Sequence, residues 1–199
     1  MKLKKLFIRG QNILLLPVSA FSTISEENHE VGMVNRNYLL PVTLLVSIFS
    51  LIGSAITNIS SPISLFPYVL TNAVIVFMLI FTHAFLSGKA VALLGQYMAP
   101  EGRSSDYYAL TLYAQLPFFL ILAFVKLFPS LIFFVIIGAY SVYLFNIGCS
   151  QLTKIPKQKI LQFTLLSTII IIGSFVVCSE LYTLLYTEII AQFSTFAGH

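Results

Sequence analysis

Residues 65–88 read LFPYVLTNAVIVFMLIFTHAFLSG and contain no Asp, Glu, Lys or Arg. The stretch is followed directly by the charged residue Lys89. A polar turn over 58–62 precedes the stretch. A helix rises 1.5 Å per residue, so about 20 apolar residues cross the hydrocarbon core of a bilayer. An uncharged apolar stretch of this length predicts a transmembrane helix, and it sets the fold class of the chain.

The composition of the whole chain agrees with a membrane protein. Of its 199 residues, 58% are hydrophobic and only 9% are charged, and the mean hydropathy is +0.93. Soluble domains carry roughly 25% charged residues, so this chain lacks the polar surface that a water-soluble fold needs. The net charge of +4 is expected to reflect membrane topology and contact with anionic lipid, and we expect no nucleic-acid partner.

Four further apolar stretches complete the membrane domain, which we place at 38–187. We expect an all-α, five-helix transmembrane bundle with spans at about 38–57, 65–88, 107–126, 129–149 and 160–180. Tyr38 would open the first span at the interface, and the second helix would continue to about Met98. Ser105 and Asp106 would cap the third helix, in which Pro117 predicts a kink. A short extracytoplasmic tail would follow over 188–199.

The first 37 residues predict a basic, amphipathic segment at the membrane interface. Its lysines and arginines can reach anionic headgroups. Pro17 suits the first turn of a helix, in which Val18, Phe21 and Ile24 would line one face. A disordered basic tail is the alternative. A cleaved signal peptide is disfavoured, because Arg9 and the polar residues after it interrupt the apolar run that such a signal requires.

The distribution of basic residues predicts the orientation. Ten of the 11 Lys and Arg residues fall on one side of the predicted membrane: Lys2, Lys4, Lys5, Arg9, Arg36, Lys89, Arg103, Lys154, Lys157 and Lys159. Only Lys126 falls on the other side. Because basic residues concentrate in cytoplasmic loops, the N-terminus is predicted in the cytoplasm. Five spans then place the C-terminus outside.

The predicted spans offer little catalytic chemistry. Their hydrocarbon cores contain no Asp, Glu, Lys or Arg, which argues against proton relays and ion-coupled transport. His83 should lie toward the cytoplasmic interface and Glu180 near the outer surface. No phosphate loop, nucleophile elbow or metal-binding spacing occurs in the sequence. We therefore expect no enzyme activity, no catalytic residue, no cofactor and no metal.

Three uncharged polar residues inside the spans are candidate intramembrane contacts: Asn72, Gln115 and Asn146. Gln115 lies two residues before Pro117. Its amide would donate to a carbonyl that the proline frees or to another helix. Ser50 and Ser54 are spaced to allow close helix packing in the first span, as are Gly53 and Thr57.

Several landmarks together resemble the Yip1 family of membrane proteins, in its bacterial branch. They are the basic start with Pro17 and Phe21, the segment THAFLSGKAVALLGQYMAPEG at 82–102, and the Tyr- and Pro-containing helix at 107–117. The segment AYSVYLFNIGCSQLTKIPKQKIL at 139–161 matches the end of the family's fourth span and its basic loop. The acidic DLYGP-type segment of eukaryotic members is absent, so Rab binding is not carried over. The resemblance implies a five-helix bundle that organises membranes through protein and lipid contacts.

Our leading functional hypothesis is a non-enzymatic membrane scaffold. It would contact membrane lipids and either another membrane or cytoplasmic protein or a second copy of itself. The candidate contact residues in the loops are Lys89, Glu101, Arg103, Lys154, Lys157 and Lys159. These charges have the simpler interpretation that they only fix topology. The alternative function is a transporter or scramblase for a lipid or neutral solute. We expect a bacterial inner membrane, or the ER or Golgi membrane if the source is eukaryotic.

Overall fold

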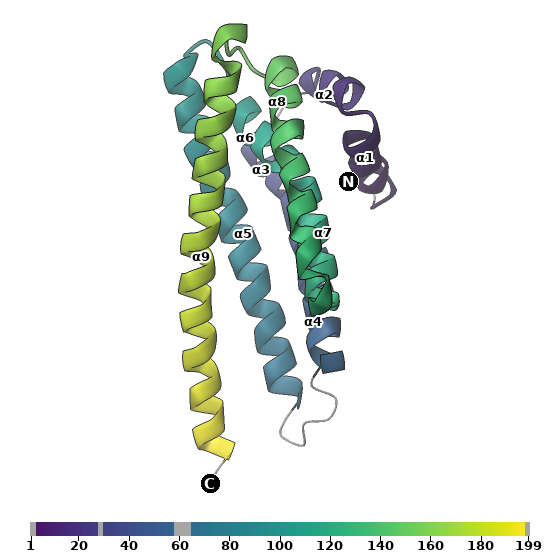
Figure 1. Ribbon diagram of the computed structural model, residues 1–199, viewed down its shortest axis with the longest axis vertical. Coiled ribbons are helices and arrows are strands. Elements are labelled where there is room, and N and C mark those ends of the chain that lie inside the picture. Colours follow the sequence, from purple (N-terminus) through teal and green to yellow (C-terminus); the bar gives the residue numbers. More distant parts are fainter. Residues whose placement is uncertain (1–2, 28–29, 58–64, 198–199) are drawn as a thin grey trace.

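The computed structural model describes residues 3–27, 30–57 and 65–197, and for 3, 65–67 and 193–197 it describes the backbone alone. Every element in these ranges is helical, and they contain no strand. Figure 1 shows the long helices aligned along one axis, with α9 (Ile160–Ala197) running nearly the full length of the molecule. The predicted all-α fold is confirmed.

Five helical stretches within these ranges are long and apolar enough to cross a membrane. They are Val31–Thr57, Tyr68–Met98, Ser104–Leu127, Pro129–Leu152 and Lys157–Gln192. Each overlaps one of the five spans predicted from the sequence. The helix of the fifth span continues far beyond its predicted end at about residue 180. The helix α9 includes most of 188–199, which we expected to be a tail.

The first span begins with two short elements, α3 (Val31–Val34) and the π-helix η1 (Asn35–Leu39), which lead into α4 (Leu40–Thr57). Tyr38 is buried, and its ring packs edge-to-face against that of Tyr113, with 4.6 Å between the centroids. Tyr38 therefore contributes to packing between helices and does not face lipid.

The second span is α5 (Leu65–Met98), which extends to Met98 as predicted. Two of its glycines accept tyrosine rings from the third span. A Cβ atom added to Gly88 would lie 2.6 Å from the ring of Tyr108, and one added to Gly95 would lie 2.5 Å from the ring of Tyr107. Since the two glycines are seven residues apart, they share one face of α5 and bring the third span close to it.

The third span consists of α6 (Ser104–Ala114) and α7 (Leu116–Leu127). The interruption falls at Gln115, two residues before Pro117, where the sequence predicts a kink.

The predicted cap of α6 is wrong. The helix already begins at Ser104, and its N-cap residue Arg103 makes no side-chain capping hydrogen bond. Asp106 lies inside the first turn, where its carboxylate accepts two hydrogen bonds of 3.0 Å from the Arg103 guanidinium. A carboxylate at this position also interacts favourably with the helix dipole.

The fourth span differs from the regular helix that we expected. Its first half is the 3-10 helix η2 (Pro129–Ala139), and α8 (Tyr140–Leu152) follows. None of the residues in η2 is buried, although η2 lies against α7. A 3-10 helix rises about 2.0 Å per residue and advances the chain further than an α-helix of equal length.

The N-terminal segment forms two helices, α1 (Leu3–Leu15) and α2 (Pro17–Ser25), beside α8 (Figure 1). Pro17 occupies the first turn of α2 as predicted. Phe21 and Ile24 are buried, whereas Val18 is 57% exposed, so the prediction that these three residues line one face is wrong for Val18. The α2 helix turns Ala20 inward in its place.

Candidate functional site

A buried polar network joins the second, third and fifth spans. The Nε2 atom of His83 lies 2.9 Å from Oε1 of Gln115, and its Nδ1 atom lies 3.0 Å from Oγ of Ser174. Gln115 also donates to Ser87 at 3.4 Å. The rings of Phe118, Phe119 and Phe175 surround the imidazole. Gln115 thus binds across to another helix, one of the two possibilities that its sequence position raised.

A second polar cluster lies between α4 and α5. Nδ2 of Asn72 donates to Oγ of Ser50 at 3.0 Å and to Oγ of Ser54 at 3.1 Å. The close packing predicted for this part of α4 is present at Gly53, where an added Cβ atom would overlap the carbonyl oxygen of Lys126 at the end of α7. These contacts hold α4 between α5 and α7.

Asn146 lies apart from the other two intramembrane candidates. Its Nδ2 atom donates to Oγ1 of Thr164 at 3.4 Å, which links α8 to α9. Asn72, Gln115 and Asn146 therefore form three separate interhelical contacts instead of one shared polar site.

Two cavities accompany these contacts. The larger, of about 690 Å³, is lined by polar side chains that include Asn72 and Lys126 and by apolar side chains that include Phe118 and Phe175. The smaller, of about 410 Å³, is lined by His83 and Gln115. Phe118, Val135 and Phe175 line both cavities. The two phenylalanine rings meet edge-to-face, with 5.1 Å between their centroids, and stand where the cavities adjoin.

The candidate loop contacts gather at one end of the bundle, where α5 ends, α6 begins and α8 connects to α9 (Figure 1). We call this part of the molecule the basic end and define it by Lys89, Glu101, Arg103, Lys154, Lys157 and Lys159. All six residues are exposed. The structure thus brings the predicted loop residues to the same end of the molecule.

Two of these residues already have partners. Arg103 pairs with Asp106. The ammonium group of Lys89 lies 5.8 Å from the ring centroid of Phe85 and 6.0 Å from that of Tyr108, within the range of cation–π attraction. Lys89 and Arg103 therefore contribute to the packing of α5 and α6.

The connection between α8 and α9 holds the other three cations in a defined position. Ile155 is buried, which anchors the loop between exposed Lys154 and the short 3-10 helix η3 (Lys157–Lys159). Thr153 reinforces the loop, since its Oγ1 atom donates to the Cys149 carbonyl at 2.7 Å. Within the described parts of the chain, these three lysines form no salt bridge.

Arg9 fastens the N-terminal helices to the bundle, a role that the sequence did not indicate. Its guanidinium donates to the Tyr113 hydroxyl at 2.8 Å and pairs with Glu27. Burial alone would lower the pKa of Arg9, but the charge interactions with Tyr113 and Glu27 outweigh burial and raise it. Arg9 therefore stays charged. The Tyr140 hydroxyl adds a hydrogen bond of 3.1 Å to the Leu14 carbonyl.

Within residues 3–27, 30–57 and 65–197, no three His, Cys, Asp or Glu side chains lie together so that they could hold a metal ion. Cys149 and Cys178 are both free thiols.

The fold defines a multi-span helical membrane protein. The family model of the Yip1 domain matches residues 12–179, and the chain belongs to this family. The match begins within α1 and ends within α9, so it includes all five candidate spans in whole or in part. No curated protein and no solved structure matches the chain.

Proposed function

We propose that this Yip1-family protein is a non-enzymatic membrane scaffold that binds a partner protein at its basic end. The observation that carries the proposal is the anchored loop between α8 and α9. Buried Ile155 fixes a short segment from which Lys154, Lys157 and Lys159 project without salt-bridge partners in the described chain. A positive surface on a rigid support favours a partner with an acidic face, because complementary charge steers association and fixes its register.

The orientation of the chain is part of this proposal. The concentration of basic residues supports an orientation with the basic end and the N-terminal helices in the cytoplasm and the C-terminus outside. The proposed location is the bacterial inner membrane, or the ER or Golgi membrane in a eukaryotic cell. In either case the lysines of the basic end face a cytoplasmic partner and the anionic headgroups of the same leaflet.

The geometry of the ionisable groups supports a non-enzymatic role. His83 is the one histidine within residues 3–27, 30–57 and 65–197, and both of its ring nitrogens are bonded to neutral side chains, those of Gln115 and Ser174. A general base needs an adjacent group to activate or a substrate within hydrogen-bonding reach. The imidazole instead joins three spans.

The test compares two triple variants of the tagged full-length chain. K154Q/K157Q/K159Q removes the charge, and K154R/K157R/K159R retains it. Both are expressed at the normal level, solubilised gently and analysed by mass spectrometry. The proposal predicts that the wild type and the arginine variant retain a stoichiometric protein that the glutamine variant loses. Equal retention by all three chains would overturn the docking assignment.

The charges could instead act only on topology, so each variant needs a topology control. A reporter at the C-terminus should give the same outside signal for the wild type and both variants. A glutamine variant that keeps its topology and loses its partner separates docking from the simpler interpretation that the lysines only orient the chain.

A second candidate function is transport or scrambling of a lipid or neutral solute. It is favoured by the two adjoining cavities, which meet at Phe118 and Phe175 between the polar groups of Asn72 and His83. Vesicles containing the purified chain and a fluorescent lipid test it directly. Lipid movement above that of protein-free vesicles, increased further by Phe118→Ala, would support this function. Movement at the background rate would overturn it.

A further inference from the structure

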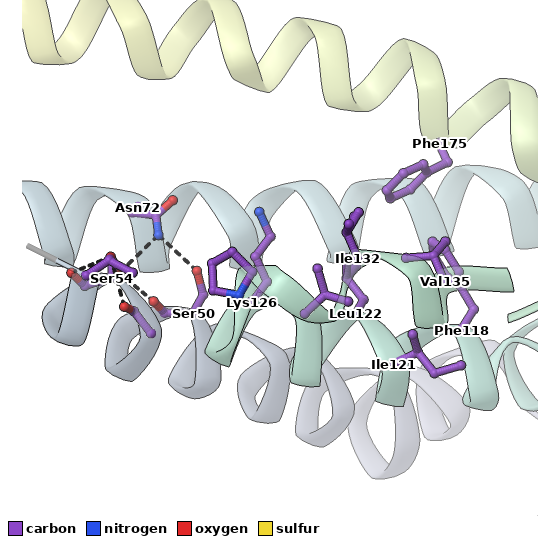
Figure 2. Close-up of a pocket in the computed structure, with 14 residues that line it drawn as sticks. Ser50, Ser54, Asn72, Phe118, Ile121, Leu122, Lys126, Ile132, Val135 and Phe175 are labelled. Carbon is purple, nitrogen blue, oxygen red and sulfur yellow. Dashed lines mark hydrogen bonds between the residues drawn. The ribbon is translucent and has the colours of Figure 1, made fainter. Parts of the chain in front are cut away.

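Lys126 is the one basic residue that the sequence predicts on the other side of the membrane from all the others. It lines the cavity of about 690 Å³. Figure 2 shows that this cavity has two different ends. Ser50, Ser54 and Asn72 lie at one end, and Phe118, Val135 and Phe175 lie at the other, with Lys126 between them. The space is thus polar at one end and apolar at the other, and the cation lies between them.

The charge of Lys126 has no counter-ion among the described residues. The residue belongs to the candidate span Ser104–Leu127 and is half-buried. No carboxylate in the described chain lies within salt-bridge distance of its ammonium group. An ionisable side chain in a membrane span is costly without a partner, and such residues usually mark a binding site or a pathway. An anion that enters the cavity would supply the missing charge.

The hydroxyls beside Lys126 already donate within their own helix. Ser54 donates to the Ser50 carbonyl, and Thr57 donates to the Gly53 carbonyl at 3.0 Å. The Lys126 ammonium carries three donors and is therefore the main group available to an incoming anion. The close contact between Gly53 and the Lys126 carbonyl holds the backbone of this lysine against α4.

The apolar end of the cavity suits a hydrocarbon chain. Beyond Lys126 the lining continues with Leu122, Ile132 and Val135 and reaches the ring of Phe175 on α9 (Figure 2). Ligand pockets of this kind are mostly apolar and have a few placed polar groups, and their volumes lie in the range of about 300–1,000 Å³. The cavity of about 690 Å³ is within this range.

The geometry points to a binding site for an anionic lipid, whose carboxylate or phosphate contacts the Lys126 ammonium and whose acyl chain lies along Leu122, Ile132 and Val135. This site is independent of the proposed docking at the basic end. It lies at the C-terminal ends of α4 and α7, at the other end of the bundle from the basic end. The carboxylate of a free fatty acid and the phosphate of a phospholipid share the required chemistry.

The experiment uses the full-length chain, purified in detergent, and three photoactivatable probes with the same acyl chain: a fatty acid, a phosphatidylglycerol and the uncharged fatty alcohol. After irradiation, adducts on residues 116–139 are quantified by mass spectrometry for the wild type, K126Q and K126R. K159Q is the matched control, since it removes one exposed lysine from the basic end. Monodispersity and the melting temperature report whether each variant folds.

The site predicts that K126Q lowers labelling by an anionic probe by about tenfold, the loss expected for one hydrogen-bonded charge contact. K126R and K159Q should stay within about twofold of the wild type, as the charge contact is kept in both. Labelling by the fatty acid alone would identify a free acid as the ligand, and labelling by phosphatidylglycerol would identify a headgroup. Either result, with its dependence on Lys126, supports the site.

A second variant probes the apolar end without changing charge. I132W places a larger side chain in the lining and should reduce labelling by the same anionic probe. Equal labelling of the wild type and K126Q would overturn the site, as would equal labelling by the fatty alcohol and the anionic probes. Equal labelling of the wild type and K126Q would mean that the Lys126 ammonium faces water and binds no ligand.

Discussion

The Nε2 atom of His83 on α5 lies 2.9 Å from Oε1 of Gln115, the residue at which α6 ends and α7 begins. The interruption of the third span thus places the side-chain amide of Gln115 against the fully buried imidazole of His83. Ser174 extends the contact to α9. One small network therefore connects three of the five spans at the point where one of them is broken.

Gln115→Leu should destabilise the folded chain by about 1–3 kcal/mol, because it leaves the buried Nε2 atom of His83 without its partner. The measurement is unfolding in a fixed detergent by circular dichroism. Gln162→Leu is the matched control, since Gln162 is exposed on α9, and it should change the free energy of unfolding by less than about 0.5 kcal/mol. Equal stability of both variants would show that the network contributes nothing.

Gly53→Ala should cost about 1–3 kcal/mol, since the added methyl group would overlap the Lys126 carbonyl and force α4 away from α7. Gly173→Ala makes the same chemical change on α9, where the added Cβ atom would have no atom of another part of the chain within 4 Å. It should be neutral or stabilise by up to about 1 kcal/mol through helix propensity. Thermal unfolding of the two variants side by side tests the pair, and a Gly53→Ala chain as stable as Gly173→Ala would contradict the close contact.

Phe21→Ala should release the N-terminal helices from the bundle. The Phe21 side chain is fully buried and reaches Gly148, where an added Cβ atom would lie 3.0 Å from its ring. Removing such a ring costs about 3–5 kcal/mol in a core, and here the loss falls mainly on the docking of α2. Hydrogen exchange of residues 3–27 should rise strongly in Phe21→Ala.

The matched control for this change is Val18→Ala, because Val18 is 57% exposed on the same helix. Its exchange rates should stay close to those of the wild type. Unchanged exchange in Phe21→Ala would show that α1 and α2 are held by Arg9 and its contacts to Tyr113 and Glu27 instead.

The sequence predicts the spans because the hydropathy of a stretch and the effect of a proline depend only on nearby residues. The uncharged run at 65–88 corresponds to α5, and the break before Pro117 separates α6 from α7. The 3-10 helix η2 was not predicted, because its apolar sequence shows no signal that distinguishes the two helical geometries.

The sites depend on contacts between distant residues and are harder to predict. Arg9 and Tyr113 are 104 residues apart, and His83 and Gln115 are 32 apart. From the sequence, Lys126 is a topology signal, and its isolation from the other basic residues is the one feature that singles it out. Periodicity shows which residues share a helix face, and only the packing of helices shows which faces meet.

The most direct test of the proposed scaffold places a photoreactive amino acid at Gln158, between Lys157 and Lys159 on the exposed surface of η3. The same amino acid at Leu166, which is exposed further along α9, serves as the control. Irradiation of living cells should join the Gln158 chain to a discrete partner protein, and K154Q/K157Q/K159Q should abolish that adduct. The Leu166 chain should not form it. The absence of a protein adduct at Gln158, or the same adduct from both positions, would contradict the account.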